Sequence, residues 1–271
     1  MNGYQNLHTH TTYVDGHVSA EEMVKAAIEK GGTSIGFSEH SHVPFDPNYS
    51  LKIDDTPKYI DEINALKKKY KDKIEIYLGI EVDYFTDFVP SGLDYIIGSV
   101  HHIKCGEKYV TVDALADTLI NAANEYFVGD FYALAERYFE TISDIMNKTN
   151  ADIIAHFDLL AKHNVGNGLF DETNPRYKAA AIDSMKEILK KNNLFEINTG
   201  AMFRLGKLEQ YPATFLLKEL LERGGEVILS SDTHDPKSLY YNFDNTLELI
   251  KTIGFKHIKR LTAKGFIDVK I

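Results

Sequence analysis

Short apolar runs alternate with amphipathic segments along the chain, and this alternation constrains the fold more than any other feature of the sequence. The apolar runs are four to eight residues long and are rich in Ile, Leu and Val, as expected for buried strands. The seven expected strands cover residues 5–8, 33–37, 74–80, 93–100, 152–155, 194–198 and 226–230. Strands that alternate with helices form βαβ units and pair as a parallel sheet.

The segments between these runs carry the start and stop signals of helices. Ser19 and Glu22 form a capping box before a helical pattern that ends at Gly31 and Gly32. Further helices are expected at about 56–70, 131–148, 175–191, 213–223 and 238–253. Because no linker, repeat or charge block interrupts the pattern, we expect a single domain over residues 1–271. Hydrophobic periodicity does not distinguish an open doubly wound sheet from a barrel.

Residues that can bind metal ions follow six of the seven expected strands. They are His8 and His10, His40, Glu81, His101, His156, and Asp232 with His234. In a barrel the C-terminal strand ends converge on one face, whereas in an open sheet they lie along a line. So many candidate ligands at strand ends favour a barrel.

The residue types indicate the chemistry of the bound metal. His8 and His10 are spaced i, i+2, which places both side chains on one side of a strand. Glu81 follows an apolar run, where a buried carboxylate is costly unless a cation compensates its charge. Cys105 is the only cysteine, so a cysteine-based zinc site is excluded, and imidazole with carboxylate suits zinc, manganese or iron. The ligands outnumber one tetrahedral site, which favours two or three divalent cations with Glu81 as a bridge.

Charge and hydropathy restrict the partners. The chain has 30 basic and 40 acidic residues, a formal net charge of −10, which disfavours nucleic acid as the main partner. No apolar run reaches the length of a membrane span, and the first residues lack the basic and apolar regions of a signal peptide. We therefore expect a cytoplasmic protein that acts on a small molecule and has no membrane partner. The sequence does not indicate an oligomeric state.

Seven short motifs follow one another along the chain. They are His8-Thr9-His10, Asp15-Gly16-His17, Ser38-Glu39-His40, Gly79-Ile80-Glu81-Val82-Asp83, Ser99-Val100-His101-His102, Ala155-His156-Phe157-Asp158 and Ser231-Asp232-Thr233-His234. Together they resemble the motifs of the polymerase-and-histidinol-phosphatase (PHP) family, and within it those of the monofunctional histidinol-phosphate phosphatases. The resemblance implies a distorted seven-stranded (β/α)7 barrel of the TIM-like type and a trinuclear metal centre.

The same resemblance implies which residues bind each metal ion. His8, His10, Glu81 and Asp232 would bind one ion, Glu81 would bridge to a second ion held also by His101 and His156, and His17, His40 and His234 would bind the third. The implied reaction is hydrolysis of L-histidinol phosphate to L-histidinol and phosphate, with a hydroxide between two metal ions attacking phosphorus in line. Glu81 and Asp232 would serve catalysis as ligands.

Further residues are candidates for binding the substrate or moving a proton. Arg204, just after the sixth expected strand, is expected to bind phosphate, and Lys162 and Lys104 are further candidates. His42, His102 and Asp15 are candidates for protonating the leaving alkoxide. In the alternative interpretation, Asp15 only forms the loop turn together with Gly16. Acidic and aromatic residues near strand ends are candidates for contacting the substrate amine and imidazole, namely Asp46, Asp83, Asp158, Phe45, Tyr84 and Phe203.

Other functions remain as alternatives. A phosphoesterase of the same family would act on another small phosphomonoester or on nucleotides, although the net charge of −10 disfavours a nuclease. An amidohydrolase also begins with His-x-His on a barrel strand, but it typically has eight strands and a carboxylated lysine as the bridge. A metal-storage module would bind the ions without catalysing turnover.

Overall fold

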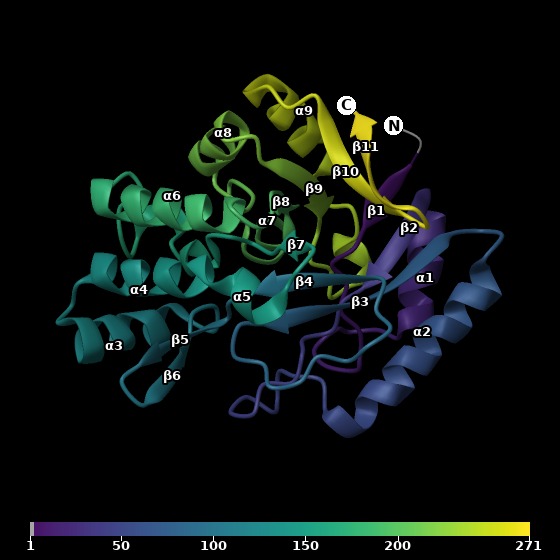
Figure 1. Ribbon diagram of the computed structural model, residues 1–271, viewed down its shortest axis with the longest axis horizontal. Helices are drawn as coiled ribbons and strands as arrows, with labels where there is room; N and C mark the ends of the chain where they lie inside the picture. Colours follow the sequence, from purple (N-terminus) through teal and green to yellow (C-terminus); the bar gives the residue numbers. More distant parts are fainter. Residues whose placement is uncertain (1–2) are drawn as a thin grey trace.

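The structure is a computed structural model that describes residues 3–271, and its centre is a barrel of parallel strands (Figure 1). Within this range seven strands pair in the order β1-β2-β3-β4-β7-β8-β9. They are β1 (Tyr4–Asn6), β2 (Gly32–Phe37), β3 (Glu75–Asp83), β4 (Tyr95–Ser99), β7 (Ile153–Ile154), β8 (Leu194–Asn198) and β9 (Glu226–Ser230). A parallel bridge between Thr9 and Thr233 links the two ends of the sheet, with the Thr233 N–H donating to the His8 carbonyl at 2.9 Å. The predicted distorted seven-stranded barrel is confirmed.

Helices connect the strands and cover the outside of the barrel. They are α1 (Ala20–Glu29), α2 (Thr56–Tyr70), α3 (Ala116–Phe127), α4 (Phe131–Ser143), α5 (Ile145–Thr149), α6 (Pro175–Leu189), α7 (Gly200–Leu205), α8 (Thr214–Glu222) and α9 (Phe243–Ile253), with short 3-10 turns at Ile53–Asp55, Leu159–Ala161, Val165–Asn167 and Pro236–Ser238. The predicted capping box of α1 is present, since the Ser19 hydroxyl accepts from the Glu22 N–H while the Glu22 carboxylate accepts from the Ser19 N–H. None of the helices in residues 3–271 is long and apolar enough to cross a membrane.

Tyr95 fills the interior of the barrel. Its hydroxyl donates to the carbonyls of Leu7 and Phe37, and its ring lies against two glycines on neighbouring strands. A Cβ atom on Gly36 would lie 2.4 Å from the Tyr95 hydroxyl, and one on Gly79 would lie 2.3 Å from Cζ of the same ring. The two glycines therefore make room for a large side chain where a barrel of this size must be packed solid.

A hairpin at the C-terminal end of the chain packs against the barrel. It consists of β10 (His257–Thr262) and β11 (Gly265–Lys270), and it lies beside β1 and β9 (Figure 1). The Leu261 N–H donates to the Gln5 side-chain oxygen at 2.8 Å, and Leu261 packs with Ile228 and Leu194 of the inner apolar cluster. The hairpin thus covers the apolar interior at the end opposite the strand termini that carry the candidate ligands.

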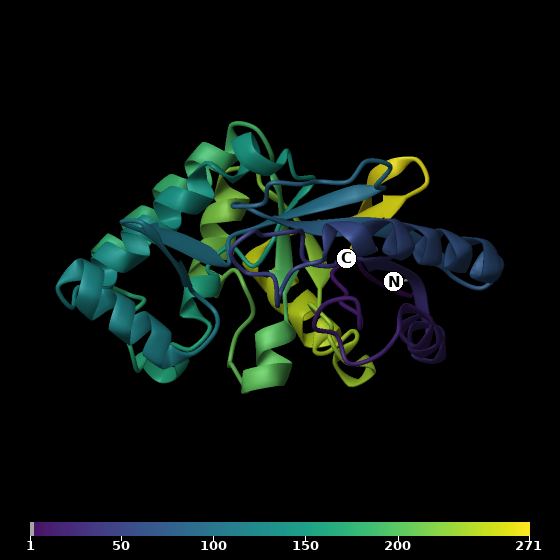
Figure 2. The ribbon, with the colours of Figure 1, turned by 90° about the horizontal axis from the view of Figure 1, so that it is seen from below.

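Several elements differ from the sequence prediction. The expected helix at 131–148 breaks at Asp144, which adopts φ −95° and ψ 3° and accepts a hydrogen bond from the Tyr84 hydroxyl at 3.0 Å. The expected helix at 238–253 begins only at Phe243, because Tyr240 and Asn242 have positive φ angles of 64° and 59°. The prediction missed α3, α7, the β10–β11 hairpin and a second hairpin, β5 (His102–Cys105) with β6 (Lys108–Thr111). The β5–β6 hairpin lies with α3 and α4 at the left end of both views (Figures 1 and 2).

The alternation of side chains along β3 positions the centre of the site. Tyr77 belongs to the inner apolar cluster, whereas its neighbours Ile76 and Leu78 belong to the cluster under the helices. With a period of two, Gly79, Glu81 and Asp83 also face the barrel interior. The strand therefore carries apolar packing at its start and two carboxylates at its C-terminal end.

Candidate metal centre

Four imidazoles surround the Glu81 carboxylate at the C-terminal end of the barrel. Oε2 of Glu81 lies 2.8 Å from His40 Nδ1 and 3.2 Å from His8 Nε2. Oε1 lies 3.0 Å from His156 Nε2 and 3.3 Å from His101 Nε2. These imidazoles follow β2, β1, β7 and β4, so the predicted convergence of strand ends brings them together around one carboxylate. Two groups suited to a metal ion share Glu81, one with His8 and His156 and one with His40 and His101.

Asp232 adds a further group to this cluster. Its Oδ1 lies 3.4 Å from His10 Nε2 and 3.7 Å from His8 Nε2. Regular pairing of β1 ends at Asn6, so His8 and His10 follow the strand, but both imidazoles face Asp232 as the i, i+2 spacing predicts.

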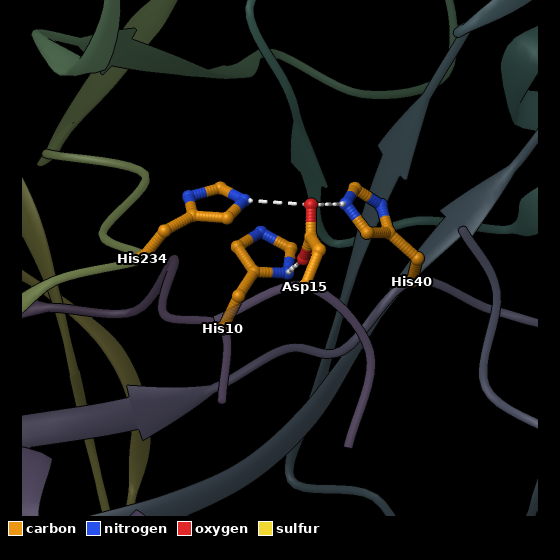
Figure 3. A group of neighbouring side chains, drawn as sticks. All are labelled: His10, Asp15, His40 and His234. Carbon is orange, nitrogen blue, oxygen red and sulfur yellow. Dashed lines mark hydrogen bonds and ion pairs between the residues drawn. The ribbon is translucent and has the colours of Figure 1, made fainter. Parts of the chain in front are cut away.

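Asp15 lies among the remaining imidazoles. Its Oδ2 is 3.2 Å from His234 Nε2 and 3.6 Å from His40 Nε2, and its Oδ1 is 3.9 Å from His10 Nδ1. Figure 3 shows the carboxylate between the rings of His234 and His40, with the His10 ring alongside. His17, expected by resemblance at this position, has a side chain that is 67% exposed and lies 3.5 Å from Asp235. The structure thus brings Asp15, rather than His17, into contact with His40 and His234.

The charges of these groups depend strongly on one another. Burial alone would raise the pKa of Glu81, but the nearby His8, His101 and His40 imidazoles hold it well below its usual value. Burial alone would lower the pKa of His101, but the Glu81 and Asp83 carboxylates raise it to about 10. Burial and the neighbouring His234 and His40 lower the pKa of His10 to about 3, so His10 is neutral at pH 7.

The donor atoms fit divalent cations. The Nε2 atoms of His8 and His10 and Oε2 of Glu81 are buried and have no hydrogen-bond partner among the described residues. Buried nitrogen lone pairs that accept no hydrogen bond are costly, and a bound cation satisfies them and compensates the Glu81 charge together. Imidazole and carboxylate form the whole donor set of the four candidate groups.

The predicted phosphate-binding residues have different surroundings. Arg204 on α7 donates to the Asp232 carboxylate at 2.8 Å and to the Asp232 carbonyl at 2.6 Å, and it lines the same cavity as His234. Lys162 lines that cavity too and donates to Asp113 at 3.1 Å. Lys104 on β5 is exposed, whereas Ile103 and Cys105 are buried, and its Nζ lies 5.9 Å from the centroid of the Tyr109 ring at the edge of a second cavity. Binding of phosphate by Lys104 therefore stays a prediction.

Two adjoining cavities open at the candidate centre. One, of about 520 Å³, is lined by His156, Lys162, Arg204 and His234 among others. The other, of about 630 Å³, is lined by His102, Phe45, Tyr109 and the carboxylates Asp46, Asp83 and Asp113. His102 Nε2 lies 3.2 Å from Asp46 Oδ2 at this second cavity. His42 lies outside the residues that line either cavity, and its Nδ1 is 2.6 Å from Asp87.

Sequence reasoning missed Glu196 and Asp113 and did not consider Asp15 as a ligand. Glu196 on β8 is buried and lies 2.6 Å from His8 Nδ1. Its signal was an acidic residue inside an expected apolar strand, which is costly unless it is paired. Asp113 follows β6, a strand that was not predicted, so no pattern indicated its place.

Comparisons with known proteins agree with this arrangement. The model of the PHP domain family matches residues 6–200. A Deinococcus radiodurans protein named "Probable histidinol-phosphatase" is 28% identical over 276 residues, covering 96% of this chain and 99% of that protein. A solved Listeria monocytogenes structure has a TM-score of 0.77 at 20% identity and covers 89% of this chain and 99% of its own. The structure of histidinol phosphate phosphatase from Lactococcus lactis, complexed with zinc, L-histidinol and phosphate, has a TM-score of 0.73 at 23% identity and covers 97% and 98%.

The two solved structures show the same fold, and the family model covers most of the barrel together with the motifs around Glu81. The chain belongs to the PHP domain family.

Proposed function

We propose that this chain hydrolyses L-histidinol phosphate to L-histidinol and phosphate at a centre of two or three divalent cations. The observation that carries the proposal is the buried Glu81 carboxylate, which four imidazoles approach to within 2.8–3.3 Å beside two open cavities. The name of the Deinococcus relative and the ligands of the Lactococcus structure point to the same substrate.

The proposed ligands follow the geometry. His8, His10 and Asp232 with Glu81 would hold one cation, and Glu81 with His101 and His156 would hold a second. His40 and His234 would hold the third with Asp15. His17 stays in the proposed set, because its backbone N–H donates to the His234 backbone carbonyl at 2.8 Å and so keeps the loop that carries His17 beside this group. Zinc, manganese or iron at these ligands would supply positive charge to phosphoryl oxygens and lower the pKa of bound water.

Arg204 would bind the phosphoryl group. Burial alone would lower its pKa, but the Asp232 carboxylate raises it, so Arg204 stays positively charged. It donates through Nη1 and Nη2 to Asp232, which fixes the plane of the guanidinium beside the proposed ligands. Lys162, which is neutralised in part by Asp113, would contribute less to phosphate binding.

The second cavity would bind the leaving group. Histidinol carries a positively charged amine and an imidazole, and this cavity offers Asp46, Asp83 and Asp113 together with the stacked rings of Phe45 and Tyr109. The centroids of these two rings are 3.7 Å apart. Carboxylates compensate the charge of an amine, and aromatic rings pack against a flat heterocycle.

His102 is the proposed donor of the proton that the leaving alkoxide needs. It lines the leaving-group cavity, and its Nε2 lies 3.2 Å from Asp46 Oδ2, a contact that holds the imidazole ring at the cavity wall. His42 is less suited because it lies beside Asp87 outside that cavity.

The test compares kcat/KM for histidinol phosphate with kcat/KM for a panel of phosphomonoesters and one phosphodiester. The protein is reconstituted separately with zinc, manganese and iron. We expect at least a hundredfold preference for histidinol phosphate, about 2.7 kcal/mol of transition-state binding. Glu81→Ala should abolish activity, whereas Lys162→Ala should reduce it moderately. A flat substrate profile would refute the substrate, and full activity after exhaustive removal of metal would refute the centre.

A further inference from the structure

β8 contributes a carboxylate that lies one layer beneath the candidate ligands. Leu194 on β8 packs in the inner apolar cluster, and Phe195 and Ile197 pack under the helices. Glu196 and Asn198 therefore face the barrel interior, because side chains alternate along a strand. The Glu196 residue is only 1% exposed, and its ion pair in the described part of the chain is with His8.

Two N–H donors and one imidazole nitrogen face the Glu196 carboxylate. His8 Nδ1 lies 2.6 Å from Oε2. On the other side, the His156 backbone N–H donates to Oε1 at 3.2 Å, and the Asn198 amide donates to Oε1 at 2.5 Å. An ionised carboxylate only accepts hydrogen bonds, so His8 must carry a proton on Nδ1 to make the contact with Oε2.

A proton on Nδ1 leaves the other nitrogen of His8 to bind a metal ion. Nε2 lies on the opposite side of the ring, 3.2 Å from Glu81 Oε2 and 3.7 Å from Asp232 Oδ1. It is buried, and no described residue forms a hydrogen bond with it. The ring is therefore held between a carboxylate that requires Nδ1–H and the carboxylates of the candidate centre.

We propose that Glu196 is a positioning residue that fixes His8 with Nδ1 protonated and directs Nε2 to the cation. The proposal rests on the proposed metal centre, because it assigns His8 as a ligand. Carboxylates that orient a ligating histidine in this way typically change metal affinity by ten- to a hundredfold when they are removed. Glu196 also accepts from the backbone N–H of His156, so it helps to position this second candidate ligand, which follows β7.

Replacement of Glu196 by glutamine is a sharp test because it keeps the size of the side chain. A glutamine amide has one accepting oxygen and one donating nitrogen. If the nitrogen faces His8, Nδ1 must give up its proton and the proton on Nε2 blocks metal binding. If the nitrogen faces Asn198 and the His156 N–H, donors oppose donors. In either orientation, the side chain at position 196 no longer holds His8 with a proton on Nδ1 and Nε2 free for the cation.

A second substitution restores an acceptor. In Glu196→Gln/Asn198→Asp, the new carboxylate at position 198 can accept from the glutamine nitrogen, and the glutamine oxygen can accept from His8 Nδ1–H. The Gly200 N–H, which donates to Asn198 Oδ1 at 2.8 Å, keeps its acceptor. Glu62→Gln is the matched control, since Glu62 is half-buried and accepts from the Tyr13 hydroxyl at 2.9 Å.

The first measurement is zinc and manganese affinity, obtained by chelator competition on the full chain. We expect Glu196→Gln to weaken binding by ten- to a hundredfold, the double variant to recover at least part of that loss, and Glu62→Gln to match the unsubstituted protein. Unchanged affinity in Glu196→Gln overturns the role of Glu196 while the centre stands. Failure of the unsubstituted protein to bind either ion overturns the proposed centre itself.

The second measurement determines the protonation of the His8 ring in the unsubstituted protein. Long-range ¹H–¹⁵N correlation spectra of the zinc-loaded protein, with the His8 signals assigned by their loss in His8→Gln, report which ring nitrogen carries a proton. We expect a protonated, slowly exchanging Nδ1 and a zinc-bound Nε2. Zinc bound through Nδ1, or a His8 ring without a proton on Nδ1, overturns the proposal.

Discussion

Binding of cations to this centre should release protons, and the number released can be worked out from the imidazoles. Carboxylates raise the pKa of His101 to about 10 and raise those of His8 and His40 well above their usual value, although burial opposes the shift in each case. We therefore expect these three imidazoles to be protonated at pH 7 in the protein without bound cations. A cation binds only the neutral form, so each of them must lose a proton.

The energetic effect on affinity follows directly. Each pH unit between the pKa of about 10 and the working pH costs about 1.4 kcal/mol of apparent binding energy, so deprotonating His101 at pH 7 costs about 4 kcal/mol. For each proton released, the apparent affinity should rise tenfold per pH unit between pH 6 and pH 8. His10, with a pKa lowered to about 3, should release none, because it is already neutral.

Titration calorimetry in two buffers with different ionisation enthalpies counts the protons released when zinc binds. We expect up to three for the whole centre in the unsubstituted protein, about one fewer in His101→Gln, and an unchanged number but weaker binding in His10→Gln. His257→Gln is the control, because His257 is an exposed residue of β10. Zinc affinity that stays constant from pH 6 to pH 8 with no proton release would refute the reasoning.

Three further outcomes are expected. Arg204→Ala should lower kcat/KM by about a hundredfold or more while metal content, measured by mass spectrometry, stays constant, since a charged donor to the phosphoryl group is lost. Gly79→Ala should destabilise the fold by about 2 kcal/mol, because its Cβ would lie 2.3 Å from the Tyr95 ring, and calorimetry should show a Tm lower by roughly 4–8 °C. Burial raises the pKa of Asp158 to about 7, so the fold binds a proton that the unfolded chain releases, and stability is lost as pH rises from about 4 to about 7. The free energy of unfolding in urea should fall less between pH 5 and pH 7 for Asp158→Asn than for the unsubstituted protein.

Local signals predicted the elements whose ends are determined by nearby residues. The helix after Ser19 begins where the capping box places it. The predicted start of α9 was wrong, because the Tyr240 N–H donates to the Ser231 hydroxyl at 3.3 Å. Hydrophobic periodicity does not report such a contact between segments. The β5–β6 hairpin had one local signal, Gly106, which has a φ of 60° at the first position of a two-residue turn. The flanking strands have only four residues each, so their hydrophobic pattern was too short to predict them.

The candidate site was predictable where strand ends carry its residues. Four imidazoles that follow strand ends meet around the Glu81 carboxylate at the end of β3. They belong to His8, His40, His101 and His156. The position of Asp15 was not predictable, because the loop that carries it is held by contacts between distant segments, such as the His17 backbone N–H donating to the His234 carbonyl at 2.8 Å. Loop geometry of this kind depends on the folded barrel and leaves no period in the sequence.

Glu196 shows why a rule based on strand ends finds only part of such a site. The rule identifies residues at the rim of the barrel, where the chain leaves the sheet and side chains are free to converge. Support for those residues comes from the layer beneath, where side chains from different strands interdigitate. Glu196 and His8 are 188 positions apart in the sequence and adjacent in that layer. A buried carboxylate in an apolar strand therefore indicates that it has a partner, but only the closed barrel identifies that partner as a histidine of the candidate metal centre rather than a lysine or a backbone amide.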